Sequence, residues 1–231
     1  MNTRAAEIIR EMEKLKDPAA IEGMARFGVV TTSALGLSTP AIRAIARRVG
    51  KDQALAEDLW ATGIHDARIL ASFVAQPAAI TRATMDRWVR DFNSWDVCDA
   101  CCCYVFDRTP FVWQKIPKWA ASHREYVRRA GFATLAYAAV HNKLEPDRRF
   151  LDGLELVEQY AFDERNFVRK AVNWALRNIG KRNQRLLPAA VACANRVRAQ
   201  GTKSARWIAA DALREFRLKF GDSVELPHHS L

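Results

Sequence analysis

The chain has 231 residues, of which 49% are hydrophobic, 27% charged and 10% aromatic. This composition excludes a disordered chain, and the length suffices to bury a substantial core in one large domain or one repeat array. The net charge of +10 at pH 7 favours a polyanionic partner, with nucleic acid ahead of an acidic membrane or protein surface, and leaves a merely soluble surface as the alternative.

The N-terminal residues enter a helical pattern directly, and no apolar run approaches the length of a membrane span. Five cysteines are present, and three of them are consecutive at Cys101, Cys102 and Cys103, which is not the pattern of a secreted disulfide framework. We therefore expect a cytoplasmic protein with reduced thiols. The cysteines are interpreted as small buried residues rather than as metal ligands.

Hydrophobic periodicity predicts helices along the whole chain and no convincing strand. Thr39 is interpreted as an N-cap with Pro40 at the first helical position, and Gly63 and Gly201 are typical of breaks between helices. The expected helices span 5–16, 18–27, 41–49, 52–62, 65–75, 80–92, 94–107, 110–121, 124–141, 147–161, 164–181, 184–199 and 203–218.

Many helices joined by short turns, without a long linker, predict an all-α solenoid of stacked antiparallel helix pairs. We expect a single HEAT-like repeat domain over residues 1–231. Its expected parts are N-terminal helices at 1–50, a repeat array at 51–220 and a flexible tail at 221–231.

The stretch from Asn93 to Phe106 contains the first candidate site. Ser94 is a good N-cap, and a helix that starts there places Trp95 and Asp99 one turn apart on one face. Between Val97 and Phe106, Asp99 carries the only charge, and most of the other residues are apolar. Burying an unpaired carboxylate costs several kcal/mol, so we interpret Asp99 as a functional group. The alternative is a structural carboxylate that caps a neighbouring helix.

Positive charge is concentrated in the second half of the chain. Residues 1–123 carry 16 Lys and Arg against 14 Asp and Glu, whereas residues 124–220 carry 20 against 10. In the helix at 164–181, Trp174 falls about 120° from the centre of the apolar stripe. It lies there beside three cations, at Lys170, Arg177 and Lys181. This grouping suits a surface that meets a phosphate backbone and presents a ring to sugar or base; the alternative is a tryptophan at the edge of the core, covered by long basic side chains.

Arg129 is the fourth candidate. Its helix is rich in small residues, which leave room for the guanidinium to reach outward to a phosphate or carboxylate. An internal salt bridge to Asp99 is the alternative. The separations of 34 residues from Trp95 to Arg129 and 45 from Arg129 to Trp174 are close to the ~40-residue period of HEAT-type repeats. Such spacing would place these side chains next to one another on one surface.

In combination, these residues resemble those of the AlkD-like DNA alkylation repair proteins, a family of HEAT-like repeat DNA glycosylases. The similar stretches are Met24–Phe27, Leu35–Pro40, Leu59-Trp60, Ser94–Asp99, Arg128–Ala130 and Val168–Arg177. The resemblance implies a right-handed solenoid with a concave basic face that releases cationic N3- and N7-alkylated purines from DNA.

By the same resemblance, Asp99 would be the catalytic carboxylate, Trp95 and Trp174 would pack on the deoxyribose of the lesion, and Arg129 would contact DNA near it. Active members commonly carry a second tryptophan where this chain has Ser94. The cations expected to contact DNA are Arg128, Arg165, Lys170, Arg177, Lys181, Lys203 and Arg206.

The expected partner is double-stranded DNA, alkylated or distorted, bound by a monomer without a cofactor, a metal or a membrane. Two other functions are compatible with the sequence. One is a non-catalytic solenoid that binds distorted or branched DNA, and the other is a protein-interaction scaffold.

Overall fold

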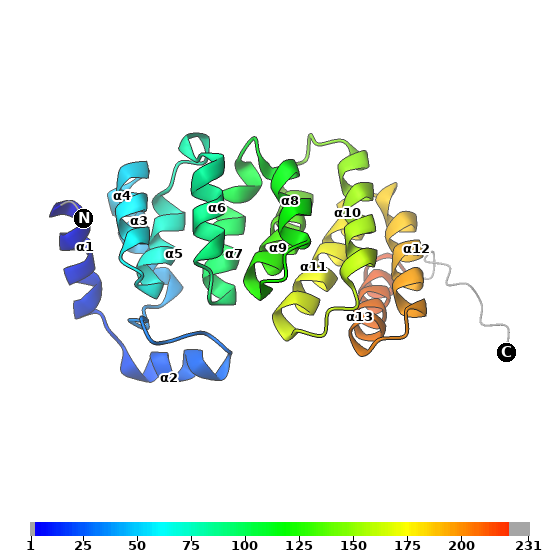
Figure 1. Ribbon diagram of the computed structural model, residues 1–231, viewed down its shortest axis with the longest axis horizontal. Coiled ribbons are helices and arrows are strands. Elements are labelled where there is room, and N and C mark those ends of the chain that lie inside the picture. The colour runs from blue at the N-terminus through cyan, green and yellow to red at the C-terminus, as the bar shows by residue number, and fades with distance from the viewer. Residues whose placement is uncertain (1–2, 222–231) are drawn as a thin grey trace. The chain divides into compact units, whose positions relative to one another are not determined.

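The computed structural model describes residues 3–221, and these residues form helices and connecting turns without a strand (Figure 1). The helices are α1 Thr3–Lys14, α2 Pro18–Arg26, α3 Thr39–Val49, α4 Gln53–Ala61, α5 His65–Val74, η1 Pro77–Ala79, α6 Arg82–Arg90, α7 Trp95–Tyr104, η2 Phe106–Arg108, α8 Val112–Ala120, α9 Glu125–His141, α10 Asp147–Tyr160, α11 Asn166–Arg182, α12 Leu186–Ala199 and α13 Lys203–Phe220. Every expected helix is confirmed with small differences at the ends, except that the helix expected at 94–107 is divided at Val105 into α7 and the short 3-10 helix η2. None of the helices in this described part is both long and apolar enough to cross a membrane.

The helices fall into two compact units. Unit 1 ends at Val112 and contains α1–α7, and unit 2 starts at Trp113 and contains the rest of α8 with α9–α13. The single repeat domain over 1–231 stays a prediction. Apart from Gly221, the tail expected at 221–231 lies outside the described residues.

In unit 1, α3, α5 and α7 pack in sequence order as one layer, with α4 against α5. Contacts near both ends show that α5 and α7 run parallel. His65 of α5 bonds Asp96 of α7 at their amino ends, and Phe73 meets Tyr104 near their carboxyl ends. Between α4 and α6, Trp60 stacks on Trp88 with ring centroids 4.2 Å apart. Figure 1 shows α2 running crosswise to the other helices of this unit.

The loop between α2 and α3 is held in place by a buried carboxylate. Asp66 accepts hydrogen bonds from the backbone N–H groups of Leu35 at 2.6 Å and Leu37 at 2.8 Å. Gly36 between them has φ +79°, and a Cβ there would lie 2.4 Å from the carbonyl oxygen of Asp17. Only glycine fits this turn without strain. The turn fixes α2, whose carboxyl end contacts Trp95.

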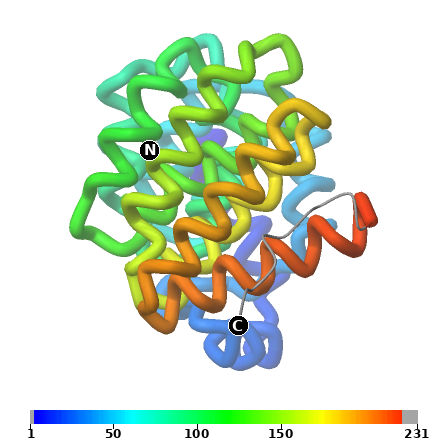
Figure 2. The backbone as a smooth tube through the Cα atoms, turned by 90° about the vertical axis from the view of Figure 1, so that its right-hand side faces the viewer, coloured from blue at the N-terminus to red at the C-terminus, as the bar shows by residue number. Residues whose placement is uncertain are grey.

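Unit 2 has two layers, with α9, α11 and α13 in one and α10 and α12 in the other; α8 packs against α9. Figure 2 shows the last pair, α12 and α13, side by side near the viewer. Hydrogen bonds join residues 38 positions apart in both helix steps of the first layer, from Arg129 to Phe167 and from Arg177 to Glu215. Asn173 and Asp211, also 38 positions apart, form a second bond between α11 and α13, and Asn178 bonds Ala136, 42 positions earlier, between α11 and α9. Two bonds of similar separation between the same two helices mean that the helices run parallel. This arrangement confirms stacked HEAT-like helix pairs.

Candidate nucleic-acid interface

Trp95 and Asp99 lie one turn apart at the start of α7, as predicted. Both residues are partly exposed, so the expectation of a buried carboxylate at Asp99 is wrong. The indole Nε1 of Trp95 donates a hydrogen bond of 3.1 Å to the carbonyl oxygen of Phe27, directly after α2. This bond fixes the ring while part of its surface stays open. Behind the pair, Cys98, Cys101 and Cys102 are buried, so one side of α7 is apolar and the Trp95–Asp99 side is not.

Ser94 precedes α7, but its side chain does not cap the helix. Its Oγ is fully buried and accepts a hydrogen bond of 2.8 Å from the backbone N–H of Val30. Ser94 is thus the N-cap residue by position, as predicted, but it lacks a side-chain capping bond, because the N–H of Val30, 64 positions earlier, uses the hydroxyl instead. Asp96 supplies a carboxylate to the first turn, and its Oδ2 lies 2.9 Å from the Nε2 of buried His65.

Cys98, Cys101 and Cys102 pack in the core of unit 1 and Cys193 in that of unit 2, as expected from their size, whereas Cys103 is half-buried. Burial is the main cause that raises the pKa of the Cys101 thiol well above its usual value, with a smaller contribution from neighbouring Cys102. Such a thiol is a weak nucleophile at neutral pH. No cluster of His, Cys, Asp and Glu with metal-binding geometry occurs in residues 3–221.

Arg129 does not reach outward as expected. Its side chain is only 6% exposed, and its Nη1 donates a hydrogen bond of 2.6 Å to the carbonyl oxygen of Phe167 in α11. The small residues of α9 serve another purpose, which is close helix packing. A Cβ on Gly131, for example, would lie 2.7 Å from the backbone nitrogen of Ala120. Arg129 thus ties α9 to the first turn of α11.

Trp174 is half-buried on α11, and its ring meets Tyr137 of α9 edge to face, with centroids 4.7 Å apart. Tyr137 in turn stacks on His141. Trp174 lies two turns after Phe167, so about 10 Å along α11 separates it from the carbonyl that Arg129 binds. Tyr137 was not predicted from the sequence. It lies about two turns after Arg129 on α9, rotated by about 80°.

The three cations expected around Trp174 differ in their partners. Arg177 lies 2.5 Å from Glu215 and 3.2 Å from Asp211, both on α13, and Lys181 also pairs with Glu215. These hydrogen bonds and charges lower the pKa of Glu215, although burial alone would raise it. Lys170 is exposed and has no ion pair among residues 3–221. It is therefore the most accessible positive charge near Trp174.

Arg128 and Arg165 share the carboxylate of Asp163. The Arg128 side chain is 6% exposed, its Nη1 contacts Asp163, and its Nε donates to the carbonyl oxygen of Ala120. Arg165 forms two hydrogen bonds to Asp163 and a third to the carbonyl oxygen of His123. Because Arg128 is enclosed, a direct contact with phosphate would require it to leave this network. Asp163 itself was missed, because nothing local distinguishes it from an exposed acidic residue.

Lys203 and Arg206 are exposed in the first turn of α13, next to half-exposed Trp207. The Arg169 guanidinium of α11 lies 5.0 Å from the centroid of the Trp207 ring. This amino end of the α11 and α13 layer therefore combines accessible cations with an aromatic ring. Such a surface suits a phosphate backbone.

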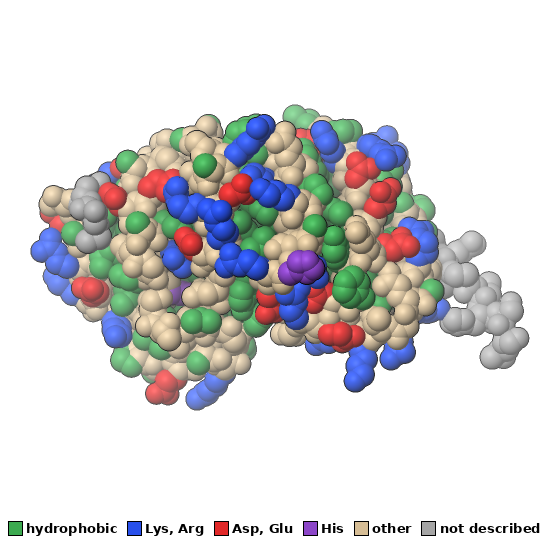
Figure 3. All heavy atoms as spheres, in the orientation of Figure 1, with side chains coloured by type: hydrophobic (Ala, Val, Ile, Leu, Met, Phe, Trp, Pro, Cys, Tyr) green, Lys and Arg blue, Asp and Glu red, His purple; other side chains and the backbone are tan. Residues whose placement is uncertain are grey.

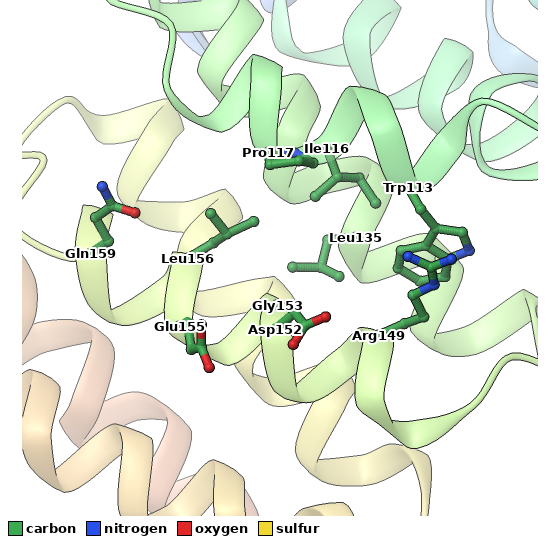
Figure 4. Close-up of a pocket in the computed structure, with 10 residues that line it drawn as sticks. All are labelled: Trp113, Ile116, Pro117, Leu135, Arg149, Asp152, Gly153, Glu155, Leu156 and Gln159. Carbon is green, nitrogen blue, oxygen red and sulfur yellow. The ribbon is translucent and has the colours of Figure 1, made fainter.

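Unit 2 also contains a cavity of about 270 Å³ between α8 and α10 (Figure 4). Trp113, Leu135 and Leu156 form apolar walls, and the carboxylates of Asp152 and Glu155 lie on the α10 side. Carboxylates at the rim repel phosphate. On the face of unit 2 shown in Figure 3, basic and acidic side chains are interspersed. Neither feature favours contact with DNA.

The structure thus places Trp95 and Asp99 together on α7 in unit 1. It places Arg129 on α9 and Trp174 on α11, two helices that pack against each other in unit 2. The meeting of these two pairs in one site stays a prediction, as does the contribution of each basic residue to DNA binding.

Comparison with known proteins gives a family. The model of the DNA alkylation repair enzyme family matches residues 8–216. A solved structure with 22% sequence identity is similar over 91% of this chain and 94% of the other, with a TM-score of 0.76. That structure is from a new family of proteins related to the HEAT-like repeat DNA glycosylases with affinity for branched DNA structures. The comparison with curated proteins gives no match. Because the family match covers nearly the whole described chain, the protein belongs to the DNA alkylation repair enzyme family.

Proposed function

We propose that this protein is a monofunctional DNA glycosylase that hydrolyses the N-glycosidic bond of cationic N3- and N7-alkylated purines. The observation that carries the proposal is the pair of Trp95 and Asp99 on one face of α7, both partly exposed. A carboxylate and an indole at this spacing can face the same ligand atom.

The chemistry requires little from the protein. An alkylated purine already carries a positive charge, so it leaves without a general acid. As the bond between the base and C1′ breaks, positive charge develops on the sugar, and water then attacks C1′. A fixed carboxylate stabilises that charge, and the electron-rich face of an indole attracts it too. Asp99 would act on the developing charge and on the attacking water, and Trp95 would hold the deoxyribose.

Two features support this assignment of roles. The bond from Trp95 to Phe27 fixes the indole before a ligand arrives, which lowers the cost of ordering it on binding. The partial exposure of Asp99 leaves it open to a water molecule or a sugar.

In unit 2, Trp174 would supply the second indole on the sugar. Its edge contact with Tyr137 restricts the ring, and the ion pairs of Arg177 and Lys181 with Glu215 keep the neighbouring cations close to it. Arg129 would act near the lesion indirectly, because its hydrogen bond to the carbonyl oxygen of Phe167 fixes the first turn of α11. Lys170, Lys203 and Arg206 would hold phosphates without regard to sequence.

The test is release of base from DNA that contains N7-methylguanine, measured for the wild type and for Asp99→Asn. We expect Asp99→Asn to lose about 100-fold or more in single-turnover rate, as is typical when one electrostatic group is removed from an active site. Asp96→Asn is the matched control, because it removes the same charge from α7 but from the residue that pairs with His65. Equal release by the wild type and Asp99→Asn would refute catalysis by Asp99.

A second candidate function is binding of branched DNA without catalysis. One reason for this candidate is that the structurally similar protein belongs to a family with affinity for branched DNA. The other is that Trp95 is preceded by Ser94, whose hydroxyl binds the N–H of Val30, and not by a second aromatic residue. This function predicts tight, salt-dependent binding of branched DNA that Asp99→Asn leaves unchanged, with no base released.

A further inference from the structure

Unit 1 has a cavity of about 520 Å³ near the carboxyl ends of α3, α5 and α7, within the usual range of about 300–1,000 Å³ for small-ligand sites. It is lined by Arg43, Ala46, Arg47, Gly50, Lys51, Phe73 and Tyr104. Tyr104 is the last residue of α7, nine positions after Trp95. The pocket therefore lies about 13 Å along α7 from the proposed site, at 1.5 Å per residue.

The lining of this pocket contains three cations and no carboxylate. Arg43 and Arg47 are exposed and have no ion pair among the described residues. Lys51 donates hydrogen bonds of 2.9 Å to the carbonyl oxygens of Phe73 and Ala75, which uses two of its three N–H groups. Burial and the nearby charge of Arg108 lower the pKa of Lys51. Positive charges gathered in this way favour an anion.

Two aromatic rings complete the pocket. Phe73 and Tyr104 meet edge to face, with centroids 4.7 Å apart and an interplanar angle of 82°. The Arg43 guanidinium lies 5.8 Å from the first centroid and 5.9 Å from the second, and its Nη2 is 2.5 Å from the Tyr104 hydroxyl oxygen. Both rings are half-buried, so part of each is open to a ligand. Aromatic rings beside cations are the usual elements of a site for single-stranded nucleic acid.

We propose that this pocket binds an unpaired nucleotide of a DNA strand, with its base against Tyr104 and Phe73 and its phosphate at Arg47 and Lys51. The inference rests on the proposed binding of DNA by this protein. It adds to unit 1 a second DNA contact besides Trp95 and Asp99, which the total charge of this part of the chain did not indicate. The ~13 Å between the pocket and Trp95 equals about four steps of B-form DNA at ~3.4 Å each. A strand that leaves the duplex near the lesion would thus follow α7.

The cavity of unit 2 supports this assignment by contrast. It is also partly aromatic, but Asp152 and Glu155 line it together with one cation, Arg149. The unit 1 pocket differs from it in charge, and charge is what separates a site for a nucleotide from one for an uncharged or cationic ligand.

The test uses fluorescence anisotropy with the full chain and three labelled DNAs: a duplex, the same duplex with a five-nucleotide single-stranded branch, and the branched duplex with abasic branch residues. Two pocket variants are compared with the wild type. Arg43→Gln/Arg47→Gln removes two charges from the pocket, and Tyr104→Leu removes one ring. The matched control is Lys14→Gln/Lys16→Gln, which removes two exposed charges elsewhere in unit 1. Thermal denaturation confirms that each variant is folded.

We expect both pocket variants to weaken binding of the branched DNA about 10-fold, and binding of the duplex by less than twofold. The double variant should also reduce the slope of log K against log salt by about 0.7, because it removes one of the two proposed phosphate ligands, Arg47, and each single-strand phosphate contact contributes about 0.7. The Tyr104→Leu effect should disappear with the abasic branch. The control should affect the duplex and the branched DNA equally.

An equal loss of affinity for duplex and branched DNA in the pocket variants would overturn the inference, because the pocket would then contact the duplex backbone. A pocket double variant that behaves like the control would overturn it too. In both cases wild-type binding of DNA would still support the proposed function. A wild type that binds none of the three DNAs would refute the proposed function together with this inference.

Discussion

Arg128 provides a sharp prediction, because its sequence position favours DNA contact while its surroundings favour a role in stability. We consider the substitution Arg128→Ala. It removes a guanidinium that is 6% exposed, contacts Asp163, donates to the carbonyl oxygen of Ala120 and lies 4.7 Å from the centroid of the Tyr160 ring. Asp163 is 5% exposed and, among residues 3–221, would keep Arg165 as its remaining ion-pair partner.

Breaking a buried ion pair by removing one partner typically costs about 3–5 kcal/mol. Because Arg165 stays in place, we expect the lower end, about 3 kcal/mol. For a chain of this length, each 1 kcal/mol shifts Tm by about 2–4 °C, so Tm should fall by about 6–12 °C.

Two measurements on the same variant distinguish the two roles. Calorimetry gives Tm, and anisotropy with duplex DNA at several salt concentrations, well below Tm, gives the number of phosphate contacts. Arg128→Ala should leave the salt slope unchanged, whereas Lys170→Ala should reduce it by about 0.9 and leave Tm unchanged. An unchanged Tm together with a slope reduced by about 0.9 in Arg128→Ala would refute the reasoning and make Arg128 a phosphate ligand.

Three further predictions follow from local geometry. Burial alone would raise the pKa of Asp163, but hydrogen bonds from Arg165 and Arg128 lower it. The ionised Asp163 therefore stabilises the fold above the ordinary pKa of 3.8, and this stabilisation is lost as the pH falls toward the lowered pKa. In acid titrations of the free energy of unfolding, Asp163→Asn should depend less on pH over this range than the wild type. Gly131→Ala should lower Tm, at a cost of about 1–3 kcal/mol, because its Cβ would meet the backbone of α8, whereas Gly23→Ala in α2 has open space and should be neutral or slightly stabilising by calorimetry. Ser94→Ala removes the acceptor of the Val30 N–H in a part-buried hydrogen bond and should cost about 0.5–1.5 kcal/mol in urea denaturation. An unchanged midpoint would contradict a stabilising role for this bond.

The helices could be predicted from the sequence because their signals are local. Asp17, Ser38 and Thr81 cap the helices that follow them, and Pro18 and Pro40 occupy first-turn positions. The cap of α3 is Ser38, one residue before the predicted Thr39. The alternation of these signals with apolar stripes also predicted the stacking of helix pairs. The fold class therefore needed no information from distant residues.

The candidate site was less predictable, because its residues take partners from other repeats. Arg128 and Arg129 are adjacent and chemically identical, yet one binds Asp163 and the other the carbonyl oxygen of Phe167. Ser94 has the residue type of a cap, but its hydroxyl serves Val30. These choices depend on which atoms an adjacent helix presents. The spacing of Trp95 and Asp99 was predictable because both lie on one helix.

The 38-residue separation between bonded positions in unit 2 limits where the chain can change its length. One residue inserted within α11 would rotate everything after it by about 100°, and would misalign the contacts of Phe167 or Arg177 with their neighbours. The same insertion in the turn between α9 and α10 would leave both helices in phase. Insertions and deletions compatible with folding should therefore concentrate in the turns, and an insertion scan of α11 compared with residues 142–146 would measure that difference.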